Sequence, residues 1–161
     1  MIREITLLDA KKIADIYNYY IVNTIITFEM EPVSENDMQQ RIKNITAKFP
    51  WIVYEENNEI LGYAYAGNWH PRAAYKNTFE TTIYLNNNNK GKGIGSILYK
   101  EIIDRVKQMK AHVIIGGISL PNEASVAIHE KFGYTKVAHY KEVGYKFDKW
   151  IDVGYWQLTL K

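Results

Sequence analysis

The chain has 161 residues, a length that fits a single domain with one hydrophobic core over residues 1–161. It contains no cysteine, which excludes disulfides, thiolate metal sites and a cysteine nucleophile. The net charge is only +2 at pH 7 and the lysines are scattered, which argues against nucleic acid as the main partner.

The N-terminus lacks the charged-then-apolar pattern of a signal peptide. No apolar run approaches the length needed to cross a bilayer. We therefore expect a cytoplasmic protein without a membrane partner.

Apolar periodicity predicts the strands and helices in chain order. The predicted strands cover residues 2–7, 51–55, 60–68, 79–85, 112–118, 134–140 and 149–160. One predicted helix is capped by Asp9, and a second is capped by Ser34 and ends before Pro50. A loop and helix over 90–109 and a short helix over 123–131 follow. Because strands flank helices without regular alternation, this order predicts an α/β domain with a mixed sheet.

The junction between the strand 79–85 and the following helix is rich in glycine and reads Lys-Gly-Lys-Gly-Ile-Gly-Ser over residues 90–96. Backbone N–H groups at such a helix start lack partners and lie at the positive end of the helix dipole, so they can bind phosphate oxygens. The spacing of the glycines fits neither a Walker loop nor a dinucleotide fingerprint. A plain turn before a helix is the alternative interpretation.

The pattern Lys90-x-x-Gly93-x-Gly95 resembles the pyrophosphate loop of the GNAT acyltransferase superfamily, usually Arg/Gln-x-x-Gly-x-Gly/Ala, from which Lys90 departs. The strand that carries Glu80 and the helix that begins at Asn122 extend this resemblance, as does the C-terminal stretch, so that it covers residues 1–160. It implies a single-domain GNAT fold, with a mixed and mostly antiparallel central sheet flanked by about four helices.

More narrowly, the chain resembles the phosphinothricin N-acetyltransferase group, which also acetylates methionine sulfoximine and methionine sulfone. This narrower resemblance depends on Ile16-Tyr17-Asn18, Phe28-x-x-Glu31-Pro32, Arg72-x-x-Tyr75-x4-Glu80, the Asn122 helix and the Trp150 ending. The ending reads Trp-Ile-Asp-Val where the group commonly has Trp-His-Asp-Val, so Ile151 removes a possible polar contact near the pocket.

The resemblance implies acetyl-CoA as the co-substrate, no metal, and a homodimer. The residues that it assigns to acetyl-CoA are Ile83, Tyr84, Leu85, Lys90, Gly91, Lys92, Gly93, Ile94, Gly95, Ser96, Asn122 and Ser125. For Asn122, a helix cap is an equally natural role.

Glu80 and His129 are the implied catalytic residues. A carboxylate at Glu80 would take a proton from the amine, directly or through water, before the amine attacks the thioester. A strand carboxylate that faces solvent is the alternative. His129 stands where many GNAT enzymes have a tyrosine, and it would bind or protonate the leaving sulfur. A histidine that only packs against the core is its alternative.

The implied acceptor is a small amino-acid analogue. Arg72 and Tyr75 would bind its oxyanions, and Phe28 and Glu29 would form the opposite wall of the pocket. Two alternatives stay open. One is acetylation of another amine, such as a protein N-terminus or a polyamine, and the other is a weakly catalytic module that binds acetyl-CoA as a sensor.

Overall fold

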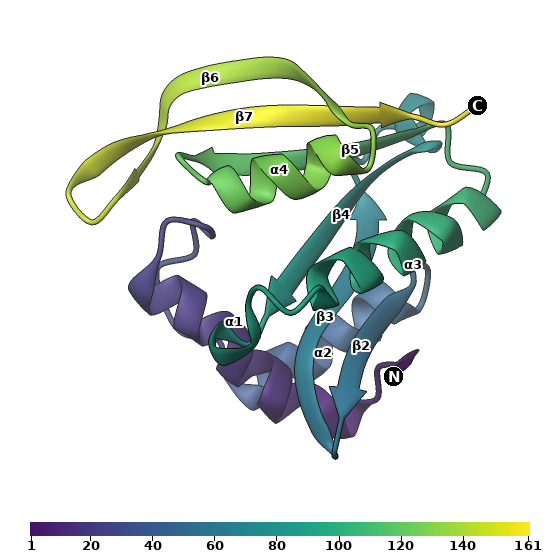
Figure 1. Cartoon of the computed structure of the whole chain (residues 1–161), viewed down its shortest axis with the longest axis vertical. Helices are drawn as coiled ribbons and strands as arrows, with labels where there is room; N and C mark the ends of the chain where they lie inside the picture. The colour runs from purple at the N-terminus through teal and green to yellow at the C-terminus, as the bar shows by residue number, and fades with distance from the viewer.

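Seven strands form one sheet in the computed structural model, which describes residues 1–161 (Figure 1). The strands are β1 (Ile2–Glu4), β2 (Trp51–Glu56), β3 (Glu59–Asn68), β4 (Thr78–Leu85), β5 (Val113–Leu120), β6 (Thr135–Lys146) and β7 (Lys149–Thr159). The α-helices are α1 (Ala10–Asn23), α2 (Glu35–Thr46), α3 (Ile94–Gln108) and α4 (Glu123–Lys131). The predicted order of elements and the mixed α/β class are confirmed. None of these helices is long and apolar enough to cross a bilayer.

The strands are arranged in the order β1-β2-β3-β4-β5-β7-β6, and every neighbouring pair is antiparallel except β4 and β5. These two parallel strands pair only from Thr78 to Glu80 on β4 and from Val113 to Ile115 on β5. Beyond these residues they diverge, as Figure 1 shows. The sheet is therefore open between its two central strands, and neighbouring backbone groups there are free to bind a ligand.

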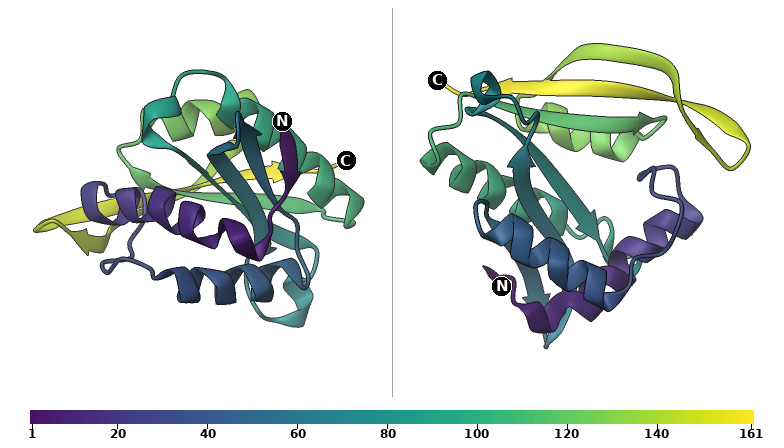
Figure 2. Two further views of the ribbon diagram at one scale, coloured as in Figure 1. Left: turned by 90° about the horizontal axis from the view of Figure 1, so that it is seen from below. Right: turned by 180° about the vertical axis from the view of Figure 1, so that it is seen from behind.

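The N-terminal half of the sheet is covered on both faces. Helices α1 and α2 pack on one face and α3 on the other (Figure 2). On one side the core includes Tyr63 and Ile13, and on the other it includes Leu98 and Ile52. Because both faces are buried, β3 reads as an almost continuous apolar run rather than as an alternation.

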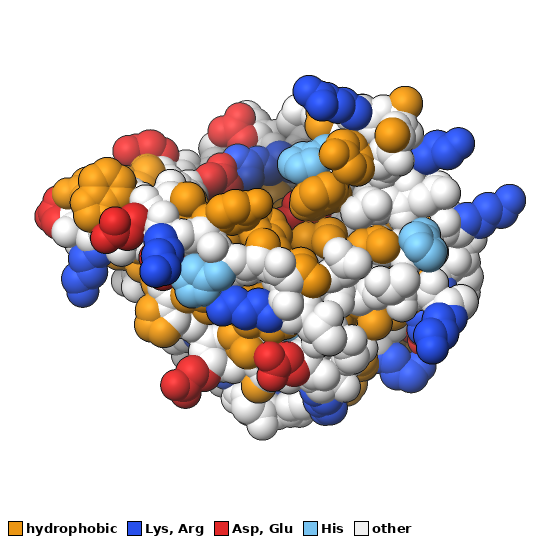
Figure 3. Space-filling model, turned by 90° about the horizontal axis from the view of Figure 1, so that it is seen from above, with side chains coloured by type: hydrophobic (Ala, Val, Ile, Leu, Met, Phe, Trp, Pro, Cys, Tyr) orange, Lys and Arg blue, Asp and Glu red, His pale blue; other side chains and the backbone are white.

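The C-terminal half of the sheet has one uncovered face. Helix α4 packs beside β5 on the side of α3, but no helix covers the opposite face. Figure 3 shows hydrophobic side chains gathered over this end of the molecule. The large hydrophobic side chains that are exposed on β6 and β7, counting both sides of the strands, are Val137, Tyr140, Val143, Tyr145 and Trp150.

Two sequence predictions are corrected near the ends of strands. Strand β1 ends at Glu4 instead of residue 7, because Leu7–Asp9 forms a 3-10 turn. Strand β6 continues to Lys146 instead of ending at residue 140, because shifts of register let it follow the long strand β7.

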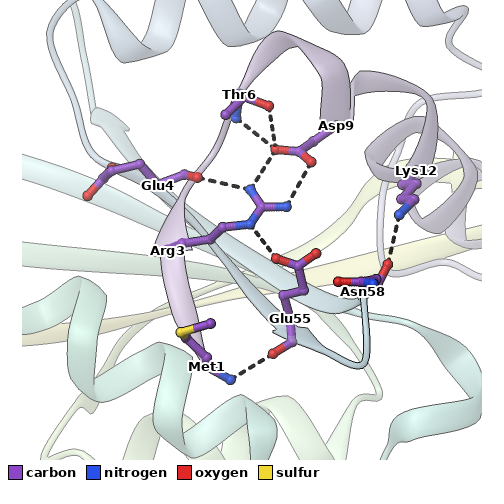
Figure 4. Close-up of polar contacts among 8 residues, drawn as sticks. All are labelled: Met1, Arg3, Glu4, Thr6, Asp9, Lys12, Glu55 and Asn58. Carbon is purple, nitrogen blue, oxygen red and sulfur yellow. Dashed lines mark hydrogen bonds and ion pairs between the residues drawn. The ribbon is translucent and has the colours of Figure 1, made fainter.

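Asp9 does not cap α1 with its side chain, contrary to the prediction. Its carboxylate instead accepts hydrogen bonds from Arg3 at 2.8 and 2.9 Å and from the Thr6 amide at 2.8 Å (Figure 4). Arg3 also donates to Glu55 at 2.5 Å, which ties β1 to β2. Burial would raise the pKa of Asp9, but the hydrogen bonds from Arg3 and Thr6 outweigh it and lower that pKa.

Candidate active site

A cavity of about 610 Å³ lies where β4 and β5 diverge. Its walls come from both strands, from the loop before α3, from α4, and from the segment that joins α1 to α2. Most of the residues assigned to acetyl-CoA line it, namely Ile83, Tyr84, Leu85, Lys90, Gly91, Gly93, Gly95, Ser96, Asn122 and Ser125. Lys92 and Ile94 do not line it.

The glycine loop gives the cavity a set of free amides. Gly93 has φ +81°, a left-handed conformation that lets the chain enter α3 abruptly. The first backbone bond at this end of the helix runs from Ile97 to Gly93, so the amides of residues 94–96 have no helical acceptor. These amides at the positive end of the helix dipole fit a pyrophosphate.

The side chains of Lys90, Lys92 and Ile94 in this loop lie in three different surroundings. The Lys90 ammonium lies 5.0 Å from the ring centroid of Tyr20 and is the only lysine or arginine on the cavity wall. Lys92 points elsewhere and donates to Asn89 at 2.9 Å. Ile94 is buried in the core with Leu98, so its side chain anchors the helix and leaves only its backbone for a ligand.

Asn122 caps α4, which was one of the two roles predicted for it from the sequence. Its side-chain oxygen accepts a hydrogen bond from the Ser125 amide at 3.1 Å. Because both residues also line the cavity, the cap does not exclude contact with a ligand. The helix start faces the same opening as the α3 loop.

Glu80 lies at the point where β4 and β5 separate, since it is the last residue of β4 that pairs with β5. Its side chain is half-buried on the cavity wall, and no hydrogen bond or ion pair within the chain holds its carboxylate. A Cβ atom added at Gly117 would be 3.7 Å from Glu80 Oε1, which shows how closely the carboxylate approaches β5. Burial raises the pKa of Glu80. An unpaired carboxylate with a raised pKa is suited to accept a proton.

His129 is buried between α4 and β5 and also lines the cavity. Its Nδ1 lies 2.7 Å from the carbonyl oxygen of Ser125. Since a carbonyl can only accept, we assign the ring proton to Nδ1, which leaves a lone pair on Nε2. Burial lowers the pKa of His129 and favours this neutral form. Nε2 can therefore accept a hydrogen bond, but it must first gain a proton before it can protonate a sulfur.

Gly116 makes room for this imidazole. A Cβ atom added at residue 116 would be 2.2 Å from Nε2 of His129, closer than atoms can approach. The sequence did not single out Gly116, because a glycine within a strand has several common causes. The role of Gly116 becomes clear only from the structure, in which α4 approaches β5 closely at this residue.

The segment between α1 and α2 supplies a wall of the cavity through Thr27 and Phe28. Glu29, which the sequence analysis grouped with Phe28, does not line the cavity. Arg41 binds its carboxylate with two hydrogen bonds, of 2.5 and 2.9 Å, and the Tyr17 hydroxyl donates to it as well. Glu29 therefore fastens the segment to α1 and α2, and its side chain lies outside the cavity.

Arg72 and Tyr75 also lie outside the cavity. Both are exposed, and the Tyr75 ring packs edge-on against Trp69 and near His70. Trp69 and His70 line a second, smaller cavity of about 350 Å³ on the uncovered face of the sheet. Tyr155 belongs to the walls of both cavities, so the two regions meet at that ring.

Two tyrosines of the cavity wall were missed as site residues. Tyr20, which the sequence places on the apolar face of α1, donates from its hydroxyl to the carbonyl oxygen of Leu85 at 2.6 Å. Tyr155 lies on β7 opposite Gly117 and near Glu80. No group of three or more His, Asp or Glu side chains is placed to hold a metal ion.

Comparison with known proteins agrees with this geometry. The acetyltransferase (GNAT) domain family matches residues 2–154. Phosphinothricin N-acetyltransferase of Streptomyces viridochromogenes is 35% identical over 156 residues, which cover 97% of this chain and 85% of that protein. L-methionine sulfoximine/L-methionine sulfone acetyltransferase of Salmonella typhimurium is 32% identical over 94% of this chain and 90% of its own length.

A solved structure is similar over nearly the whole fold. The crystal structure of a phosphinothricin acetyltransferase from Sinorhizobium meliloti, in complex with acetyl-CoA, superposes with a TM-score of 0.96 at 31% identity. The match covers 99% of this chain and 88% of the other. The chain therefore belongs to the GNAT acetyltransferase family and is an acetyl-CoA-dependent acetyltransferase.

Proposed function

We propose that the enzyme transfers acetyl from acetyl-CoA directly to the amino group of a small amino-acid analogue such as phosphinothricin, methionine sulfoximine or methionine sulfone. The observation that carries the proposal is the unpaired carboxylate of Glu80 at the apex of the open sheet, in one cavity with the free amides before α3. The names of the relatives support this class of acceptor.

In this proposal the two ends of the cavity have different tasks. The amides of residues 94–96 and the Lys90 ammonium bind the pyrophosphate of acetyl-CoA. Glu80 takes the proton that the ammonium of the acceptor must lose before its nitrogen attacks the thioester carbonyl. The C–S bond then breaks and the sulfur of CoA leaves as a thiolate, which either departs unaided or takes a proton from Nε2 of His129 once that nitrogen has been protonated. The acetyl group passes from sulfur to nitrogen without a bond to the enzyme.

A wall on the acceptor side of the cavity favours a small molecule over a peptide. Thr27 and Phe28 form a wall there, and the neighbouring Glu29 ties that wall to α2 through Arg41. A peptide acceptor would need an open groove in this place. The predicted role of Arg72 and Tyr75 in binding oxyanions is part of the proposal, although both lie outside the cavity and the Tyr75 ring packs against Trp69.

The test is thiol release from acetyl-CoA by purified enzyme, with phosphinothricin, methionine sulfoximine, methionine sulfone, spermidine and a short peptide as acceptors. Turnover of the first three, with a higher acceptor KM in Arg72→Ala, is the expected result. Turnover of spermidine or the peptide alone would overturn the proposed acceptor class. A complete lack of release, with retained binding of acetyl-CoA, would favour the sensor alternative.

We also propose that two chains form a homodimer in the cytoplasm through the exposed apolar side chains of β6 and β7. Large apolar side chains gather there, and Trp150 is 65% exposed. Contiguous apolar surface of this kind marks an interface in proteins that stay in solution. Light scattering during size-exclusion chromatography should give twice the mass of one chain, and a monomeric mass at micromolar concentration would contradict the dimer.

A further inference from the structure

Lys146 is the only lysine or arginine that the fold buries, and its side chain is 1% exposed. No carboxylate lies within ion-pair distance of its ammonium. The hydrogen bond that Nζ makes runs to the backbone carbonyl oxygen of Thr27, at 2.8 Å. A buried ammonium without a counter-ion costs free energy, so this position calls for an explanation other than stability.

The carbonyl that Lys146 holds belongs to the acceptor wall. Thr27 and Phe28 line the cavity, and no other hydrogen bond links β6 to the segment between α1 and α2. The Thr27 hydroxyl lies 2.8 Å from the hydroxyl of Tyr17, so α1 holds the side chain of this residue while β6 holds its backbone.

A second contact from the same strand reaches the next residue of the wall. Gly144 lies two positions before Lys146, on the same face of β6. A Cβ atom added there would be 2.4 Å from the Phe28 ring, so the ring occupies the space that a side chain at residue 144 would fill. Strand β6 therefore contacts two successive wall residues, one through a hydrogen bond and one through close packing.

We propose that Lys146 is a positioning residue for the acceptor: it holds the Thr27–Phe28 wall at the distance from Glu80 that the acceptor amine requires. The identity of the acceptor rests on the function proposed above. The loop that is suited to the pyrophosphate lies before α3 and has no contact with Lys146, so the affinity for acetyl-CoA is not involved. The ammonium thus serves acceptor binding at the expense of fold stability.

The test compares Lys146→Met with Lys149→Met, which removes the exposed lysine that pairs with Lys146 across the hairpin. Loss of a hydrogen bond from a charged group should raise the acceptor KM of Lys146→Met about ten-fold. The KM for acetyl-CoA should stay at its wild-type value. Amide hydrogen exchange in residues 24–33 should become faster. Lys149→Met should match the wild type in all three measurements.

Gly144→Ala is the second variant, because it pushes on Phe28 without removing a charge. It should also raise the acceptor KM while exchange outside residues 24–33 stays at the wild-type rate. An unchanged rate of exchange in residues 24–33 of Lys146→Met would overturn the proposal, as would an equal rise of both KM values. If wild-type enzyme acetylates none of the proposed analogues, the proposed acceptor fails, and the exchange measurement alone decides the role of Lys146.

Discussion

The two halves of the sheet bury their strands in different ways. Strands β2 to β4 are enclosed between α1 and α2 on one face and α3 on the other, whereas β5 to β7 carry only α4 on one face. The first half is therefore a core with two layers of helix, and the second half leaves apolar side chains uncovered. The cavity lies where the two halves meet, beside Glu80.

In the proposals above, it is the open half that serves acceptor binding and assembly. A sheet built only for stability would cover both faces. The second cavity beside Trp69, the exposed aromatic side chains of β6 and the buried Lys146 all lie on the open half. Substitutions in the first half should therefore lower the stability of the fold, whereas substitutions in the second half should weaken acceptor binding or dimer formation.

The largest effect is expected at the junction itself, in Glu80→Gln. Loss of the base should lower kcat about 10²- to 10⁴-fold, the range for general acid-base catalysis. Because burial raises the pKa of Glu80, wild-type kcat should fall as the pH drops through that raised value, where the carboxylate becomes protonated. This acidic limb should be absent from the pH profile of the variant, and equal kcat in the two proteins would contradict the role as base.

Thermal unfolding provides the control for this variant. A carboxyl group whose pKa is raised by folding contributes stability at low pH and loses it as the pH rises through the folded pKa. Glu80→Gln should therefore unfold at no lower temperature than the wild type at pH 8. A lower unfolding temperature would mean that lost activity reflects a damaged fold.

The next effect concerns the enclosed half. Leu98→Ala should lower the free energy of unfolding by about 3 kcal/mol, because Leu98 is fully buried between α3 and the sheet and a cavity would remain. Its comparison is Trp150→Ala on the open half, which should cost less than about 0.5 kcal/mol at protein concentrations that keep the chain monomeric. Urea unfolding measures both, and equal losses would mean that the open face is covered within one chain.

Arg3→Met tests the polar network at the far end of the enclosed half. Without Arg3 the buried carboxylate of Asp9 loses its cation, and we expect a loss of about 2 kcal/mol at pH 7. The lowered pKa of Asp9 contributes stability above its unfolded value, and this is lost as the pH falls through the folded value. The urea midpoint should therefore fall less steeply from pH 5 to 3 in the variant.

The matched control for this network is Lys11→Met. Lys11 pairs with Asp15 on the exposed surface of α1, where water and salt screen an ion pair and it adds little to stability. If Lys11→Met lost as much stability as Arg3→Met, burial of the Asp9 carboxylate would not be the cause.

The sequence predicts those parts of the site that depend on local pattern. The strand that ends at Leu85, the glycine loop and the cap at Asn122 are each encoded within a few neighbouring residues, and the structure has all three. The resemblance of these motifs led to the family, which the comparisons confirm.

The contacts that the sequence does not predict are those between residues far apart in the chain. Glu29 and Arg41 are 12 positions apart, and Lys146 and Thr27 are 119 apart. A lysine next to aromatic residues in a strand is typical of an exposed edge, so no local pattern indicates that Lys146 is buried. Likewise, Arg72 is exposed in a segment whose Tyr75 ring packs against Trp69, and periodicity does not encode such a contact.

The smallest expected effect is a difference in stability between glycine substitutions in two hairpin turns, one in each half of the sheet. Asn57 and Asn58 join β2 to β3, and Phe147 and Asp148 join β6 to β7, all four with positive φ. Asparagine tolerates this left-handed conformation better than most residues, while glycine adopts it freely. Asp148→Gly should therefore stabilise the protein by about 0.5 kcal/mol, and Asn58→Gly by less.

Thermal unfolding at equal protein concentration should show a rise of about 1 to 2 °C for Asp148→Gly. The Tyr145 hydroxyl donates to Asp148 at 3.4 Å, a contact too long to offset the relief of backbone strain. A larger gain in Asn58→Gly would place the strain in the enclosed half instead. We expect the larger gain for Asp148→Gly because its turn also holds a phenylalanine with positive φ. This turn belongs to the uncovered half of the sheet, where we propose that a second chain binds.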